Sequence, residues 1–134
     1  STFAGNPISV TAAINSIKII NKNKNRLYAK LERNCELLAD EIDDIATDYK
    51  IPHQINSIAS MFQIFFSSKP VTDYKTSKKA DGKKFNKLFS NLLKNGVFIA
   101  PSQFESVFLS DAHTDADITK TLGAYGLSLK VVKH

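Results

Sequence analysis

The sequence predicts an α+β fold, in which a small antiparallel sheet of about three strands packs against helices in the order ααβαββα. Three observations support this prediction. Apolar residues recur at helical spacing in four stretches, residues 55–67 alternate as a strand does, and two short apolar segments flank the turn at Pro101-Ser102. No repeat or linker divides the 134 residues, so they are expected to form one unit.

The first two expected helices occupy the N-terminal third. Asn6 is a good N-cap and Pro7 suits the first helical position, which predicts a helix over 7–21. The polar run 21–25 predicts a break or kink, followed by a second helix over 24–49. The side chains expected to face a core are Ile8, Ala12, Ile14 and Ile17 in the first helix, and Leu27, Leu31, Cys35, Leu38, Ile42 and Ile45 in the second.

The remaining elements follow Pro52. Residues 55–67 carry apolar side chains on both sides of the alternation, which predicts a strand covered on both faces. A helix over 81–95 should end at Gly96 as its C′ residue, followed by short strands over 97–100 and 105–109. Thr114 and Asp117 form a capping-box pattern that predicts a last helix over 115–130.

The charge and cysteine content limit the possible partners. The net charge is +5, and much of the excess lies in the lysine-rich stretch 69–84. Tyr74 alone interleaves these lysines and arginine is scarce, so a solvated loop is favoured over a nucleic-acid site. No apolar run is long enough to cross a membrane. Cys35 is the only cysteine, which favours a reducing, cytoplasmic setting and a core position for that side chain.

Two stretches could carry chemistry. Thr2 and Gly5 precede a helix N-terminus, where backbone N–H groups and the helix dipole favour a phosphate, although a turn with an N-cap explains the same residues. Glu105 lies among apolar residues and is either held in a site or exposed on an edge strand, the second being favoured by the residues alone. The histidines lack metal-ligand spacing, and His113 is expected to bond the turn before the last helix.

Three segments together resemble one enzyme family. TFAGNP before a helix, SMFQIFF on a strand and GVFIAPSQFESVFLSDAHTDADI near the end occur in one order. Val71, Tyr74, Ser77, Ala80 and Asp81 add a V-x-x-Y-x-x-S-x-x-A-D pattern. The chain thereby resembles the glutamate-1-semialdehyde 2,1-aminomutases, which are pyridoxal-phosphate enzymes of the class III aminotransferase-like group. The resemblance covers nearly the whole chain.

The resemblance implies a role for each anchor. Thr2 would bind the cofactor phosphate across a homodimer interface, with Gly5 and Asn6 in the same turn, and Glu105 would lie beside the substrate. The reaction implied is the isomerisation of glutamate-1-semialdehyde, a small molecule, to the tetrapyrrole precursor 5-aminolevulinate. Ser1, Ala4 and the FESVF run depart from the family's usual residues.

The resemblance also implies that part of the enzyme is missing. Residues 1–22 would be an interdomain turn and helix, and 23–134 the small C-terminal domain of a fold-type I enzyme. The large cofactor-binding domain, with its Schiff-base lysine, would be absent, so the chain alone is expected to be inactive. A related class III aminotransferase and an autonomous basic interaction module are the two alternatives.

Overall fold

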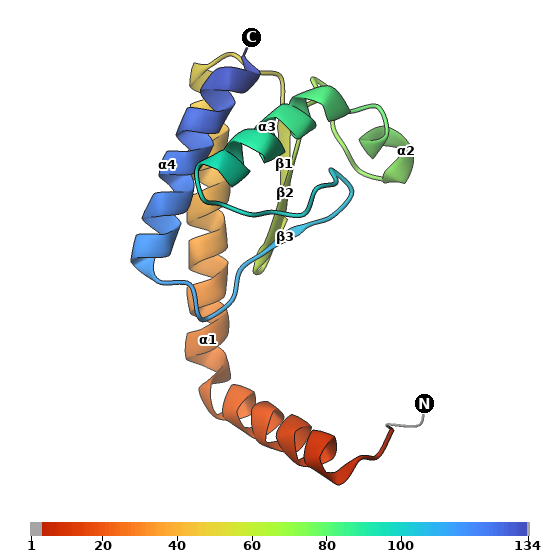
Figure 1. Ribbon diagram of the computed structural model, residues 1–134, viewed down its shortest axis with the longest axis vertical. Coiled ribbons are helices and arrows are strands. Elements are labelled where there is room, and N and C mark those ends of the chain that lie inside the picture. The colour runs from red at the N-terminus through yellow and green to blue at the C-terminus, as the bar shows by residue number, and fades with distance from the viewer. Residues whose placement is uncertain (1–3, 134) are drawn as a thin grey trace.

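The structure is a computed structural model that describes residues 4–133. The elements are α1 (Pro7–Asp48), β1 (Gln54–Ile58), β2 (Met61–Phe65), α2 (Tyr74–Ser77), α3 (Gly82–Lys94), β3 (Val107–Phe108) and α4 (Asp115–Val132). Figure 1 shows α4 alongside the second half of α1, with α3 and the sheet next to them. The predicted α+β class and the antiparallel three-stranded sheet are confirmed.

The two helices expected before residue 50 are one continuous helix, so of the predicted break or kink the break is wrong. Asn6 caps α1 by accepting hydrogen bonds from the Ile8 and Ser9 amides, and Pro7 opens the helix as predicted. The predicted kink is visible as a change of direction in the first half of α1 (Figure 1). In that half the Asn23 side chain donates to the Ile19 carbonyl 2.9 Å away, which competes with the helical bond at that carbonyl.

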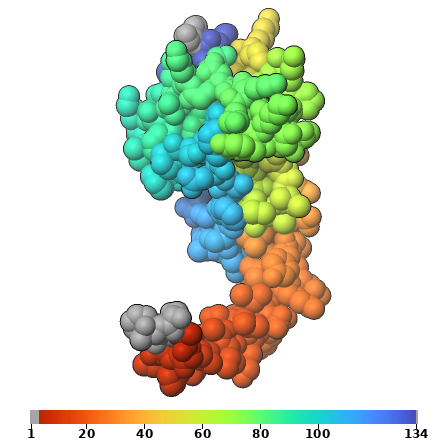
Figure 2. Space-filling view, turned by 90° about the vertical axis from the view of Figure 1, so that its right-hand side faces the viewer, coloured from red at the N-terminus to blue at the C-terminus, as the bar shows by residue number. Residues whose placement is uncertain are grey.

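The apolar side chains at the start of α1, predicted to face a core, meet none within the described residues. Ile8 and Ile17 are 81% and 57% exposed, and Ala12 and Ile14 are exposed as well. Full burial in α1 begins only at Asn34. Figure 2 shows this first half projecting from the body of the fold, so no other described residue covers its apolar side chains. The second stripe is confirmed from Cys35 onward, where the helix meets β1 and α4.

The single strand expected over 55–67 is a hairpin. Ile58 pairs with Met61, which leaves Ala59 and Ser60 as a two-residue loop. Ala59 has φ +52, the left-handed conformation that such tight loops need and that glycine or asparagine usually supplies. The loop was missed because an Ala-Ser pair carries no turn signal. β2 is the central strand and also pairs with β3.

The region between the hairpin and β3 contains one unpredicted helix and lacks one predicted strand. The short α2 is capped by Asp73, which shares a capping box with Thr76. The helix expected over 81–95 is confirmed as α3, with Asp81 as its N-cap. Residues 97–100 form no strand. The amides of Gly96 and Val97 instead bond back to Leu93 and Leu92, as in a Schellman motif. Gly96 has φ +79, so the predicted C′ cap is confirmed.

The core lies between α1, α3, α4 and one face of the sheet, here called the inner face. Phe62 and Ile64 project from this face, and Tyr125 and Leu129 of α4 meet them. The Thr114–Asp117 capping box at the start of α4 is present as predicted. The expectation that the central strand is covered on both faces is confirmed. Phe65 points the other way, into a small cluster with Val71 and Ala80.

No helix within residues 4–133 is both long and apolar enough to cross a bilayer.

Candidate functional site

The face of the sheet turned away from α1 and α4, here called the outer face, carries the segment that contains Glu105. Met61, Gln63 and Phe65 of β2 alternate with the core-facing residues and therefore project from the outer face. The segment 101–106, here called the Glu105 loop, covers part of this face. Its clearest anchor is a 2.9 Å hydrogen bond from Gln63 Nε2 to the Gln103 carbonyl oxygen. The loop is thus fixed to the central strand.

The Glu105 side chain is exposed, as the residues alone favour, but it precedes β3 and does not lie on the strand predicted over 105–109. Its backbone amide donates to the Ser102 carbonyl at 3.1 Å, and the Phe104 amide donates to Ser102 Oγ at 3.2 Å. The loop is therefore a tight turn immediately before β3. A carboxylate held out from such a turn can accept hydrogen bonds from an ammonium or hydroxyl group brought against it.

Two hollows flank this loop on the outer face. One has a volume of about 310 Å³, and the rings of Tyr74 and Phe104 lie at its edge with their centroids 5.6 Å apart. The other, of about 210 Å³, is lined by Gln63, Met61 and Ser106 among others. Glu105 lines neither, but its two sequence neighbours each line one. Apolar walls with a few amide and hydroxyl groups suit a small polar ligand.

The turn before α1 holds the other predicted site residues. Thr2 lies outside the described residues. Gly5 has φ +84, and no atom lies within 4 Å of where a Cβ would be, so the conformation rather than crowding calls for glycine. Asn6 Oδ1 is occupied by the cap. Figures 1 and 2 show the start of α1 standing away from the sheet. Within this chain the turn and Glu105 are not brought together.

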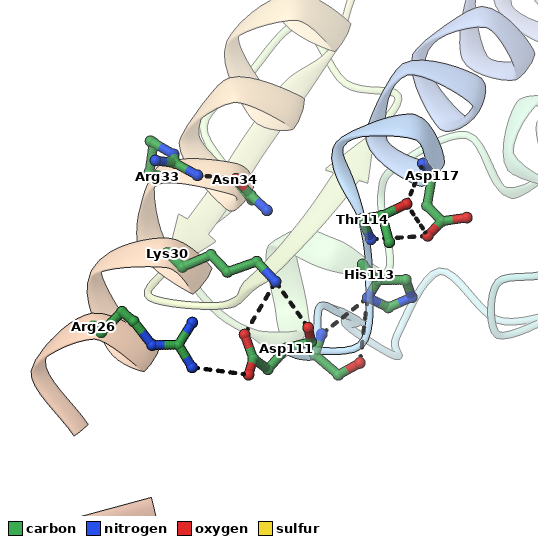
Figure 3. A network of polar contacts seen from close by, with 9 residues as sticks. Arg26, Lys30, Arg33, Asn34, Asp111, His113, Thr114 and Asp117 are labelled. Carbon is green, nitrogen blue, oxygen red and sulfur yellow. Dashed lines mark hydrogen bonds and ion pairs between the residues drawn. The ribbon is translucent and has the colours of Figure 1, made fainter. Parts of the chain in front are cut away.

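A polar network missed by the sequence reasoning fixes the other end of β3. Lys30 Nζ donates to the backbone carbonyl oxygen of Asp111 at 2.8 Å and to its carboxylate at 3.0 Å. Arg26 approaches the same carboxylate at 3.7 Å, as Figure 3 shows. The Ser110 amide donates to His113 Nδ1 at 3.0 Å, so the predicted role of His113 in the turn is confirmed. Opposite charges 81 positions apart leave no pattern in the sequence that could have identified this contact.

The titrating groups add little chemistry to the outer face. Burial, together with the charge of Glu36, raises the pKa of the Cys35 thiol, and the side chain is a core residue as predicted. Every lysine is at least partly exposed. No cluster of three or more His, Cys, Asp or Glu suited to a metal occurs among residues 4–133. The site as described therefore consists of the Glu105 loop, its anchor Gln63 and the two hollows.

Comparison with known proteins relates the chain to one enzyme along its whole length. It is 70% identical over all 134 residues to the glutamate-1-semialdehyde 2,1-aminomutase of Nitrosopumilus maritimus, of which it covers 32%. It is 54% identical over 129 residues to glutamate-1-semialdehyde 2,1-aminomutase 1 of Cenarchaeum symbiosum, of which it covers 31%. The chain thus spans about a third of the length of these relatives. No family model matches it.

Solved structures support the fold. An omega-transaminase from Sphaerobacter thermophilus superposes with a TM-score of 0.81 over 100% of this chain and 30% of its own, at 16% identity. A structure described as a transaminase with PLP bound gives a TM-score of 0.80 over 98% of this chain and 29% of its own, at 18% identity. At such identities the likeness concerns the fold alone.

Proposed function

We propose that this chain, which is homologous along its whole length to part of the glutamate-1-semialdehyde 2,1-aminomutases, forms part of an enzyme of that activity. The enzyme would isomerise glutamate-1-semialdehyde to 5-aminolevulinate, a step toward tetrapyrroles. The observation that carries the proposal is the 70% identity over all 134 residues. The chain would be the C-terminal portion of a longer, cytoplasmic polypeptide, of which residues 1–22 connect to the remainder.

Pyridoxal phosphate would be the cofactor, and only part of its site would come from this chain. The turn before α1 fits a phosphate in one respect, because the backbone at Gly5 is open to approach. The amides of Ile8 and Ser9 are engaged by Asn6, so Asn6 would act by holding the turn in shape. Thr2 and Gly5 would then contact the phosphate. When bound, the cofactor supplies the electron sink that allows an amino group to move between carbons.

Glu105 would act on the substrate. Its carboxylate is exposed on a tight turn and is carried next to the two hollows, where a small molecule can lie. A carboxylate repels the substrate's own carboxylate and attracts its amino group. We therefore assign Glu105 the role of accepting a hydrogen bond from that amino group, which orients it and can hold one of its protons.

The parts of the active site that this chain lacks would come from elsewhere in the assembly. The exposed apolar side chains of Ile8, Ile14 and Ile17 form a surface that the remaining two-thirds of the polypeptide, or the second subunit of a homodimer, would cover. The turn before α1 would likewise serve a cofactor bound outside this chain. Without those parts the chain would have no activity.

An aminotransferase acting between two separate molecules is the second candidate. Such an enzyme needs a cation for the carboxylate of its second substrate, and arginine is the usual choice. Arg26 approaches Asp111 and Arg33 approaches Asn34, both from α1 and away from the outer face. This arrangement favours the aminomutase.

The test is made in the full-length protein. Purified enzyme with pyridoxal phosphate is assayed for 5-aminolevulinate formed from glutamate-1-semialdehyde. We expect Glu105→Gln to lower kcat on the order of 100-fold, since a positioned acid or base contributes about that much. Glu41→Gln, on an exposed position of α1, serves as the matched control and should leave the rate unchanged.

Three results would contradict the proposal in different ways. A wild-type enzyme that transfers amino groups only to separate oxo acids would establish the aminotransferase. An active enzyme in which Glu105→Gln behaves as Glu41→Gln does would remove Glu105 from the mechanism but leave the activity in place. Full activity of the 134-residue chain alone would show that no other part is needed.

A further inference from the structure

Gln63 occupies an unusual position for a polar side chain. It lies in the middle of the central strand, opposite Asn56 of β1, and is only 5% exposed. On the other side of β2, the pairing with β3 ends at Phe62 and Val107. The chain before β3 therefore leaves the sheet at the level of Gln63. At that point the Gln63 side chain donates a hydrogen bond to the Gln103 carbonyl, in place of a backbone hydrogen bond between strands.

Gln103 is held a second time through its side chain. Its Nε2 donates to the Ser77 carbonyl at the end of α2, at 3.4 Å, and the same carboxamide packs beside Gly82 at the start of α3. The Gln103 main chain is thus bonded to β2, and the Gln103 side chain lies between α2 and α3. Glu105 follows two residues later, in a turn closed by its own amide.

The energetics indicate what the Gln63 carboxamide contributes. Its Oε1 is buried and accepts no hydrogen bond from any residue in the described part of the chain. An unpaired buried oxygen lowers stability, so an apolar side chain of the same size would suit packing better. The one bond that the carboxamide does make goes to the Glu105 loop.

We propose that Gln63 is a positioning residue that sets the place of Glu105 through the Gln103 carbonyl. Losing the donor frees the loop from the central strand while leaving the sheet and its inner face intact. The geometric part of this inference stands on the hydrogen bonds alone. Its consequence for catalysis rests on the role proposed above for Glu105.

The experiment compares two glutamine substitutions in the full-length protein with pyridoxal phosphate. Gln63→Met keeps the length of the side chain and removes the donor. Gln54→Met is the matched control, because Gln54 lies on the same outer face but donates only to the neighbouring His53 carbonyl. Hydrogen exchange of the amides of residues 103–106 is measured together with kcat and KM, in both the wild-type and the Glu105→Gln backgrounds.

We expect Gln63→Met to raise exchange in the Glu105 loop by about ten-fold or more, with exchange in α3 and α4 unchanged. It should lower kcat roughly ten-fold or more while KM changes less than about two-fold, since misplacing a reacting group affects the transition state most. In the Glu105→Gln background the kcat loss should vanish, because Gln63 acts through Glu105. Gln54→Met should change neither quantity.

Two outcomes would overturn the inference, and one would separate it from the proposed function. Unchanged loop exchange in Gln63→Met would refute the anchoring role. A kcat loss that persists in full in the Glu105→Gln background would show that Gln63 does not act through Glu105. Faster loop exchange with unchanged kcat would support the anchoring of the loop but refute the role of Glu105 in the reaction.

Discussion

A substitution at Tyr125 is the most informative test of the core, because the ring and the hydroxyl group of this residue have opposite effects on stability. The side chain is 1% exposed, and its ring lies against Phe62 with the centroids 6.3 Å apart. The hydroxyl is buried as well, and within residues 4–133 it has no hydrogen-bond partner. The substitution Tyr125→Phe removes only that hydroxyl.

The magnitude follows from the two contributions. The ring keeps its contacts, so almost no apolar burial is lost. A buried polar group without a partner costs about 1–3 kcal/mol, which the variant no longer bears. Removing the oxygen leaves a small gap, which offsets part of the gain. We expect Tyr125→Phe to raise the free energy of unfolding by about 1 kcal/mol.

The same burial gives the effect a pH dependence. Burial raises the pKa of Tyr125 far above its ordinary value near 10. Above that ordinary value the unfolded chain releases the proton and the folded chain keeps it, so the wild type loses stability by about 1.4 kcal/mol per pH unit. Below it, protonation contributes nothing to the difference. The advantage of Tyr125→Phe should therefore be constant up to about pH 9 and widen above pH 10.

Urea denaturation of the 134-residue chain, followed by far-ultraviolet circular dichroism, measures both effects. The chain is suitable because the main core cluster lies within it, from Cys35 to Val132. Tyr28→Phe is the matched control, since Tyr28 is exposed, and it should be neutral within about 0.5 kcal/mol. A loss of 1 kcal/mol or more in Tyr125→Phe would refute the reasoning, because it would mean that the hydroxyl is bonded, for instance to an ordered water.

Two further predictions concern single turns. Ala59→Gly should stabilise the chain by about 0.5–1 kcal/mol in the same urea assay, because Ala59 holds a positive φ that glycine adopts freely. Ala116→Gly, an exposed position in the first turn of α4, is its control and should destabilise, so equal signs for the two would count against the assigned turn. At the start of α4, the Thr114 side chain and then its backbone amide lower the pKa of Asp117 by donating hydrogen bonds. The stability that this carboxylate contributes is present above the ordinary aspartate pKa near 4 and is lost as pH falls below it. Asp117→Asn should therefore reduce the acid dependence of unfolding, measured from pH 6 to pH 3, and an unchanged acid profile would contradict this assignment.

The features predicted correctly from the sequence are those fixed by neighbouring residues. Asn6 with Pro7, Gly96, and Thr114 with Asp117 each act within one helical turn, and the structure has all three arrangements. Helical spacing likewise placed α3 and α4 within about two residues at each end. Residues 97–100 show the opposite case. Their apolar composition suits a strand, but the Schellman bonds direct the chain away from the sheet.

The hairpin was missed for a conformational reason. Ala59 takes a backbone conformation that alanine seldom adopts, and the pairing of β1 with β2 outweighs its cost. The sequence alternation continues across the loop, so it cannot distinguish one long strand from two short ones. The prediction for the start of α1 was limited for a different reason. The apolar spacing correctly predicted a helix but could not identify what would cover the apolar side chains.

The same distinction applies to the candidate site. Glu105 can be recognised from the sequence, whereas the contacts that hold its loop cannot. Glu105 was identified because its neighbours resemble a family motif, and its exposure was the interpretation favoured by the residues themselves. Its support was not identified, because Gln63 lies 40 positions from Gln103. In the sequence, Gln63 is one polar residue in an apolar strand. Its function becomes apparent only once the hairpin has placed it beside the last pair of β3. A substitution at Gln63 is therefore expected to affect catalysis without altering any residue of the Glu105 loop.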